Sequence, residues 1–167
     1  MHTVARLALA FVALTTFVSV EAHAQSKKDD IPVDALPPGV KAVLVQYVDM
    51  LRASKDIDAA AKGLLLIAGG GVVNEAGNAL RTDVPRFSLK KDFDDVKFYA
   101  DPVAVTRVNV ASSNGQGFGA SAIKGKVYKI WIGKKEGAAG MPAPISIMVP
   151  EGHATIKTPK VVNIGSL

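Results

Sequence analysis

The spacing of apolar residues changes at Pro102, and this change constrains the fold more than any other feature of the sequence. Before Pro102, apolar residues recur every three or four positions, which places one apolar face on a helix. After it, apolar and polar residues alternate with a period of two, which is typical of strands. Helices followed by a run of strands predict an α+β domain, in which N-terminal helices pack on one face of a curved antiparallel sheet.

Three helices are expected before Pro102. The apolar spacing predicts the first over residues 40–51. Asp56 is expected to cap the second helix, and the glycines at 69–71 to end it, because glycine adopts the left-handed C-cap conformation at little cost. Ser88 is the expected N-cap of the third helix, which stops before Pro102 because the residue preceding a proline disfavours helical geometry.

Period-two segments predict four strands, over residues 103–110, 127–132, 145–149 and 160–164. The small, polar and glycine-rich residues 111–121 are expected to form a long hairpin loop between the first two strands. Phe98 and Tyr99 fit either the end of the third helix or an early strand.

The N-terminus has the features of a cleaved signal peptide. Arg6 supplies a positive charge, and the apolar run over residues 7–20 is shorter than the roughly 20 residues of a membrane span. Small residues precede the expected cleavage between Ala24 and Gln25, and no Cys stands there to receive a lipid. We therefore expect an exported protein, periplasmic or secreted, without stable membrane insertion after cleavage; an uncleaved anchor is the alternative.

After cleavage, residues 25–39 are expected to be a flexible lead-in, and residues 40–167 a single domain. The sequence has no Cys, which excludes disulfides, thiolate zinc sites and a Cys nucleophile. Its net charge is +5, but the cations are dispersed, so no nucleic-acid partner is expected.

No catalytic, metal or cofactor site is expected from the motifs. The glycines in residues 115–119 lack the spacing of a nucleotide-binding loop and are interpreted as a flexible hairpin tip. Asp92, Asp94 and Asp95 lack the spacing of a calcium loop and are interpreted as a solvated helix face. His153, the only histidine after cleavage, is interpreted as part of an exposed turn rather than as a partner of a carboxylate such as Glu151.

Five residues are candidates for lining a ligand pocket: Tyr47, Phe98, Tyr99, Arg107 and Trp131. For the aromatic residues the alternative is plain core packing. On an inner sheet face, Arg107 would bind a carboxylate or phosphate through two parallel hydrogen bonds, whereas on the outer face it would be a surface cation.

The short acidic step between the first two helices, residues 54–58, and the final segment, residues 159–167, resemble the NTF2-like superfamily, which includes the SnoaL-like proteins. One departure is that Lys160 follows Pro159, where the superfamily usually places an aromatic residue before its last strand. The resemblance implies a cone-shaped, helix-covered sheet that encloses a pocket, often in a homodimer. It implies no single activity, because one fold hosts many functions.

Three functions remain open at this point. The first is binding of a small apolar or amphipathic ligand in the cone, without catalysis. The second is an enzyme of the isomerase, dehydratase or hydrolase type, with an Asp or Tyr as its proton-transfer group. The third is an envelope accessory or assembly module that uses the apolar strand at residues 145–149.

Overall fold

The computed structural model describes residues 29–167, so the expected signal peptide and its cleavage site lie outside the described residues. The helices are α1 (Pro38–Ala53), α2 (Ile57–Ile67) and α3 (Leu89–Asp95). The strands are β1 (Asp29–Ile31), β2 (Val105–Gln116), β3 (Ile123–Ile132), β4 (Ala143–Pro150) and β5 (Lys160–Asn163). Within residues 29–167, no helix is both long and apolar enough to cross a membrane.

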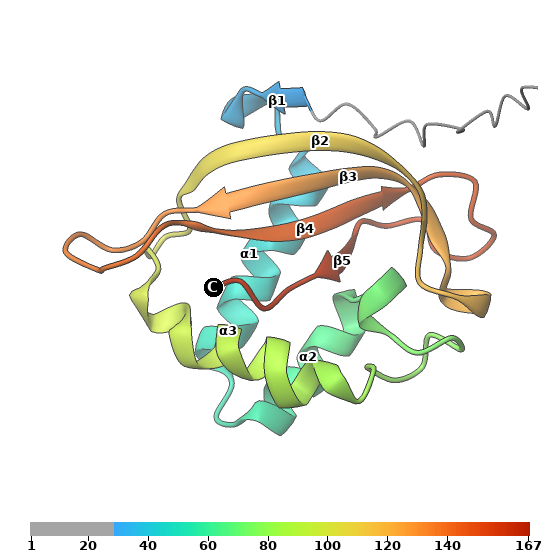
Figure 1. Ribbon diagram of the computed structural model, residues 1–167, viewed down its shortest axis with the longest axis horizontal. Coiled ribbons are helices and arrows are strands. Elements are labelled where there is room, and N and C mark those ends of the chain that lie inside the picture. Colours follow the sequence, from blue (N-terminus) through green and yellow to red (C-terminus); the bar gives the residue numbers. More distant parts are fainter. Residues whose placement is uncertain (1–28) are drawn as a thin grey trace, which may run out of the picture.

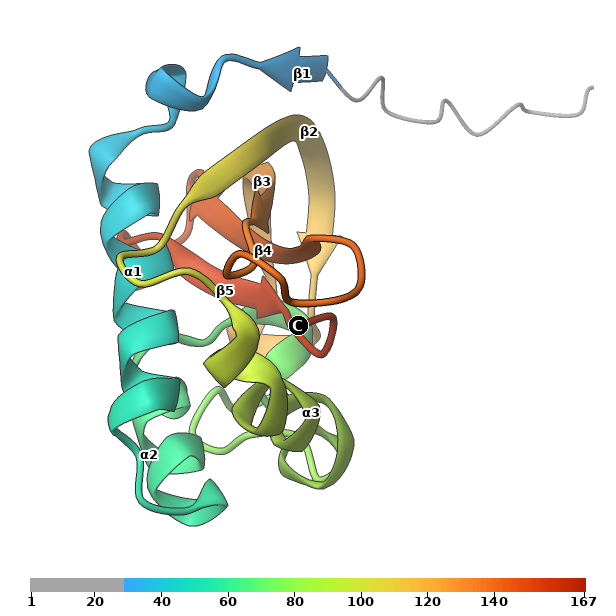
Figure 2. The same cartoon turned by 90° about the vertical axis from the view of Figure 1, so that its left-hand side faces the viewer.

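The strands form one open antiparallel sheet in the order β1-β2-β3-β4-β5. α1 lies against one side of this sheet, and α2 and α3 lie below the strands in both views (Figures 1 and 2). The α+β class with helices on an antiparallel sheet is therefore confirmed, although the sheet is not strongly curled. None of the three helices covers the side of the sheet opposite α1, which we call the open face.

The apolar core lies between the helices and the other side of the sheet. α1 contributes its predicted face, in which Val40, Leu44, Tyr47, Val48 and Leu51 are buried. The sheet contributes Val108, Ile130, Ile145 and Ile147. Each fully buried aliphatic side chain contributes about 2 kcal/mol relative to exposure, so this interface holds the layers together.

Strand β1 corrects the prediction of a flexible lead-in. Residues Asp29–Ile31 pair with residues 108–110 of β2 and form the first edge of the sheet. A strand of three residues is too short to show a period of two, and two of its residues are aspartates, which strands disfavour. Its formation depends instead on pairing with the longer strand β2.

The helix boundaries are confirmed at α2 and corrected at α3. Asp56 caps α2 as predicted, because its Oδ1 accepts a hydrogen bond from the backbone N–H of Ala59 at 2.8 Å. Ser88 makes no capping bond, since α3 continues directly from a π-helical turn over Val84–Ser88. Tyr99 follows the last helical turn and forms a single antiparallel bridge with Lys134, so it belongs to neither of its two expected elements.

The predicted hairpin loop over residues 111–121 is mostly strand. β2 continues to Gln116, and β3 starts at Ile123. Where β2 ends, Gly117 has a φ of 83°, and a Cβ there would lie 2.7 Å from the carbonyl group of Gly70. The hairpin tip is therefore packed against the turn that follows α2, which its small residues permit.

This contact gives a test of the packing. Gly117→Ala is expected to lower the free energy of unfolding by more than about 1 kcal/mol, because a positive φ is strained for alanine and the new Cβ meets backbone. Gly115→Ala is the matched control, since a Cβ at Gly115 has nothing within 4 Å. Urea denaturation of both variants checks the prediction, and equal effects would contradict it.

Candidate ligand-binding site

Five polar side chains form one continuous row across the open face. The strand register places Asp30, Asn109, Lys129, Ser146 and Asn163 directly opposite one another on β1 to β5. Their neighbours along the strands, such as Ile130 and Ile145, are fully buried in the core. Because side chains alternate between the faces of a sheet, the row projects from the open face. We call it the polar row.

A groove of about 270 Å³ follows the polar row. It is lined by Asn109, Ala111, Gln116, Val127, Lys129, Ser146 and Asn163. Ala111 and Val127 are paired across β2 and β3, two residues along the strands from Asn109 and Lys129 of the polar row. The groove therefore has the polar row along one side, and Ala111 and Val127 form an apolar floor beside it, with Gln116 beyond them on β2. We call it the open-face groove.

One end of the groove is bounded by a second apolar cluster. Ile123, Met148 and Val162 are buried on the open face, and Val127 and Ile156 pack against them. Ile156 comes from the loop between β4 and β5. Met148 is covered here, and Ile145 and Ile147 are covered in the main core. The apolar strand at residues 145–149 would need a partner only if it were uncovered, and these three side chains are covered within the chain.

The other end of the groove leads to Trp131. Its ring centroid lies 4.7 Å from the guanidinium carbon of Arg107 and 5.2 Å from the Nζ of Lys129. Both distances are within the range of cation–π attraction. The three side chains therefore restrain one another beside the polar row.

Arg107 binds a carboxylate through two hydrogen bonds, but the carboxylate is that of Asp30. Its Nε and its terminal nitrogen each donate to Asp30 at 3.1 Å, and the amide of Asn109 donates to the same carboxylate at 2.5 Å. The hydrogen bond from Arg107 is the main cause that holds the pKa of Asp30 below its ordinary value of 3.8. Arg107 lies on the outer side of the sheet with its side chain half exposed, as a surface cation whose charge is compensated.

Removal of Arg107 tests this assignment. Arg107→Ala is expected to raise the pKa of Asp30 towards 3.8, because the carboxylate loses its strongest partner. Carboxyl-detected NMR titration measures the shift, and Arg86→Ala is a control cation outside this site. The idea is wrong if the pKa of Asp30 stays low in Arg107→Ala.

Lys129 is the remaining cation of the groove. Among residues 29–167 it forms no ion pair with a carboxylate, and the residue is partly buried. The hydroxyl of Ser146 and the amide of Asn163 follow it along the polar row. Neither makes a side-chain hydrogen bond to another described residue, whereas the amide of Asn109 is engaged by Asp30. Within the polar row the free hydrogen-bond donors are thus on β3 to β5, and the amide of Gln116, at the end of β2, is a further donor that lines the groove.

Tyr47 and Asp92 meet in the core rather than at a pocket. The Tyr47 hydroxyl donates to Asp92 at 2.7 Å, and the backbone N–H groups of Gly165 and Leu167 each donate to it at 2.9 Å. Burial raises the pKa of Asp92 above 3.8, against the effect of these three donors. Burial, followed by the Asp92 charge, raises the pKa of Tyr47 well above 10.

Asp92 therefore corrects the prediction of a solvated acidic face on α3. Only its neighbours behave as predicted, since Asp94 pairs with Lys90 at 2.7 Å and Asp95 with Lys91 at 3.5 Å, both at the surface. These are i, i+4 pairs along one helix. The sequence shows three similar aspartates, and only the packing of α3 on α1 distinguishes Asp92.

The Tyr47 hydroxyl is expected to stabilise the fold. Tyr47→Phe should lower the free energy of unfolding by about 2 kcal/mol, because it removes a donor to a buried carboxylate. It should also raise the pKa of Asp92 further. A raised folded pKa means that stability is lost as the pH rises, so the penalty should be larger at pH 7 than at pH 3.5.

Urea denaturation at the two pH values measures this effect. Tyr128→Phe is the control, since the Tyr128 hydroxyl forms no hydrogen bond with a described side chain or backbone group. A penalty that falls with rising pH would contradict the assignment.

The five predicted pocket residues do not line a common cavity. Tyr47 and Tyr99 are buried in the core, with at most 1% of their surface exposed, so the alternative of core packing is correct for them. Phe98 lies at the surface beside Lys97. Only Arg107 and Trp131 adjoin, and together they line a separate shallow hollow of about 240 Å³ beside Met141 and Pro142. The sequence did not single out Lys129, Ser146 or Asn163, because their alignment follows from the register of separate strands.

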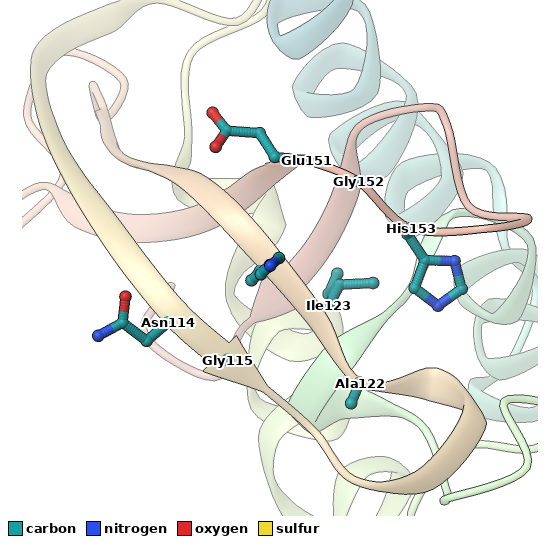
Figure 3. Close-up of a pocket in the computed structure, with 8 residues that line it drawn as sticks. Asn114, Gly115, Ala122, Ile123, Glu151, Gly152 and His153 are labelled. Atoms are coloured by element: carbon teal, nitrogen blue, oxygen red, sulfur yellow. The ribbon is translucent and has the colours of Figure 1, made fainter.

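A second hollow, of about 260 Å³, lies where the β2–β3 hairpin meets the chain after β4 (Figure 3). Glu151 and His153 lie on opposite sides of it and do not point toward each other. The Nδ1 of His153 accepts hydrogen bonds from the backbone of Thr155 and Ile156, at 3.2 and 2.9 Å. His153 therefore organises a turn, whereas the polar side chains of the open-face groove stand side by side on neighbouring strands.

No family model, curated protein or solved structure matches this chain. A proposal for the function of this groove therefore rests on its own side chains. Within residues 29–167, no three or more His, Cys, Asp or Glu side chains are grouped closely enough to hold a metal ion.

Proposed function

We propose that this chain is an exported, non-catalytic binding protein that holds a small molecule in the open-face groove. The observation that carries the proposal is the half-buried, unpaired Lys129 within a row of polar side chains on a sheet face that no described helix covers. Polar groups that converge over an apolar floor are the usual composition of a ligand site.

The dimensions of the groove favour a small ligand. Its volume of about 270 Å³ is slightly below the usual range of ligand pockets, which is roughly 300 to 1,000 Å³. The apolar floor of Ala111 and Val127 and the polar row support an amphipathic ligand over a purely apolar one. The ligand site is thus proposed on the open face instead of between helices and sheet, where Tyr47 and Leu44 are fully buried.

Membership of the NTF2-like superfamily is part of the proposal. It is supported by the order of elements, in which two helices, a turn and a third helix precede four antiparallel strands. A homodimer would also agree with the resemblance.

The enzyme alternative has less support from the geometry. It needs an Asp or Tyr that faces a ligand cavity with a shifted pKa. Asp92 and Tyr47 have raised pKa values, but they bond to each other and to backbone in the core. The groove itself is lined by amides, a hydroxyl, an ammonium group and aliphatic side chains, which suit binding.

Native mass spectrometry of the protein purified from its own periplasm tests the proposal. We expect the mass of residues 25–167 plus a small bound molecule. Ser146→Leu, which fills the groove, should remove that added mass, whereas Ser112→Leu on exposed β2 surface should retain it. A bare mass for the unmodified protein, or an added mass that survives Ser146→Leu, would count against this function.

A further inference from the structure

We infer that the open-face groove selects a small amphipathic monocarboxylate, whose carboxylate binds at Lys129 and whose apolar part lies on Ala111 and Val127. This inference rests on the proposed function and specifies its ligand. It follows from the charge, the donors and the floor of the groove.

The charge of the groove favours a single negative charge in the ligand. Lys129 is the one cation that lines it, and no carboxylate does. The nearby Arg107 is already bonded to Asp30 through two hydrogen bonds, so the charges of this pair offset each other. A ligand cation would be repelled by Lys129, and a dianion would retain one uncompensated charge in a half-buried place.

The donors match the two oxygens of a carboxylate. Lys129, Ser146 and Asn163 are neighbours on three consecutive strands. Adjacent strands are about 4.8 Å apart, so donors on two of them reach different oxygens of one planar group. The amide of Asn109 is held by Asp30, which places the head group on the β3 to β5 side of the row.

The floor of the groove suits a short aliphatic or aromatic body. Ala111 and Val127 face each other across β2 and β3. Val127 also packs on the buried cluster of Ile123, Met148 and Val162, so the floor is backed by closely packed side chains. Burial of one methylene group there increases the affinity by up to about fourfold.

Trp131 provides a direct reporter, because it is the only tryptophan in the sequence. The ammonium group of Lys129 lies 5.2 Å from its ring centroid. An anion that binds Lys129 changes the charge that the ring experiences and hence its fluorescence. Backbone amide shifts of β3 and β4 give a second, independent reading.

The experiment titrates butyrate, hexanoate and octanoate into the protein, and in parallel the alcohols of the same chain lengths. We expect each carboxylate to bind at least tenfold more tightly than its alcohol. Affinity should rise with chain length until the groove is full. Both the Trp131 fluorescence and the amide shifts are recorded.

Two variants test whether the charge of Lys129 is what selects the carboxylates. Lys129→Gln should reduce carboxylate affinity at least tenfold and leave the alcohols unchanged, with amide shifts as the reading because the variant alters Trp131 fluorescence itself. Lys126→Gln is the matched control, since Lys126 is exposed on the same strand and its side chain points to the opposite face.

The outcomes distinguish the inference from the proposed function. Equal binding of alcohols and carboxylates, or a carboxylate preference that survives Lys129→Gln, would overturn the ligand class and leave the groove as a binding site. If no probe shifts the groove amides and the native mass is bare, the binding function fails, and the inference fails with it.

Discussion

The buried carboxylate of Asp92 connects parts of the chain that are far apart in the sequence. It receives the hydroxyl of Tyr47 from α1 and the backbone N–H groups of Gly165 and Leu167 after β5. A buried carboxylate is costly unless its oxygens accept hydrogen bonds, so these donors have to stay in place together. Asp92 thereby fixes the chain that leaves β5, and with it the position of Asn163 at the end of the polar row.

The arrangement of side chains on the open face depends on the register of the strands. A shift of one residue in any strand would turn its polar residue into the core and its apolar neighbour outward. The irregularity between Ser146 and Ile147 in the β4–β5 pairing lets Val162 join the apolar cluster while Asn163 still stands opposite Ser146. This irregularity in the β4–β5 pairing thus positions both the apolar cluster behind the floor of the groove and the polar row.

Most helices and strands could be predicted from the sequence, but which strands pair and which side chains meet could not. Its apolar spacing located α1, α2, the first half of β2 and most of β3, β4 and β5, because core burial imposes that spacing directly. It missed β1, which is too short to have a period, and it missed the polar row, which exists only when five strands are aligned. It could not distinguish Asp92 from Asp94, since local sequence does not show which side of α3 meets Tyr47.

The pairing of Asp30 with Arg107 has a consequence for selectivity. Asp30 is a tethered competitor, present at an effective concentration on the order of millimolar or more, against which any dissolved anion would have to compete for the guanidinium group. An anion at a concentration well below this value would not displace Asp30 from Arg107. In the proposed binding site, the short edge strand β1 would therefore block Arg107 and leave Lys129 as the cation that a dissolved anion can reach.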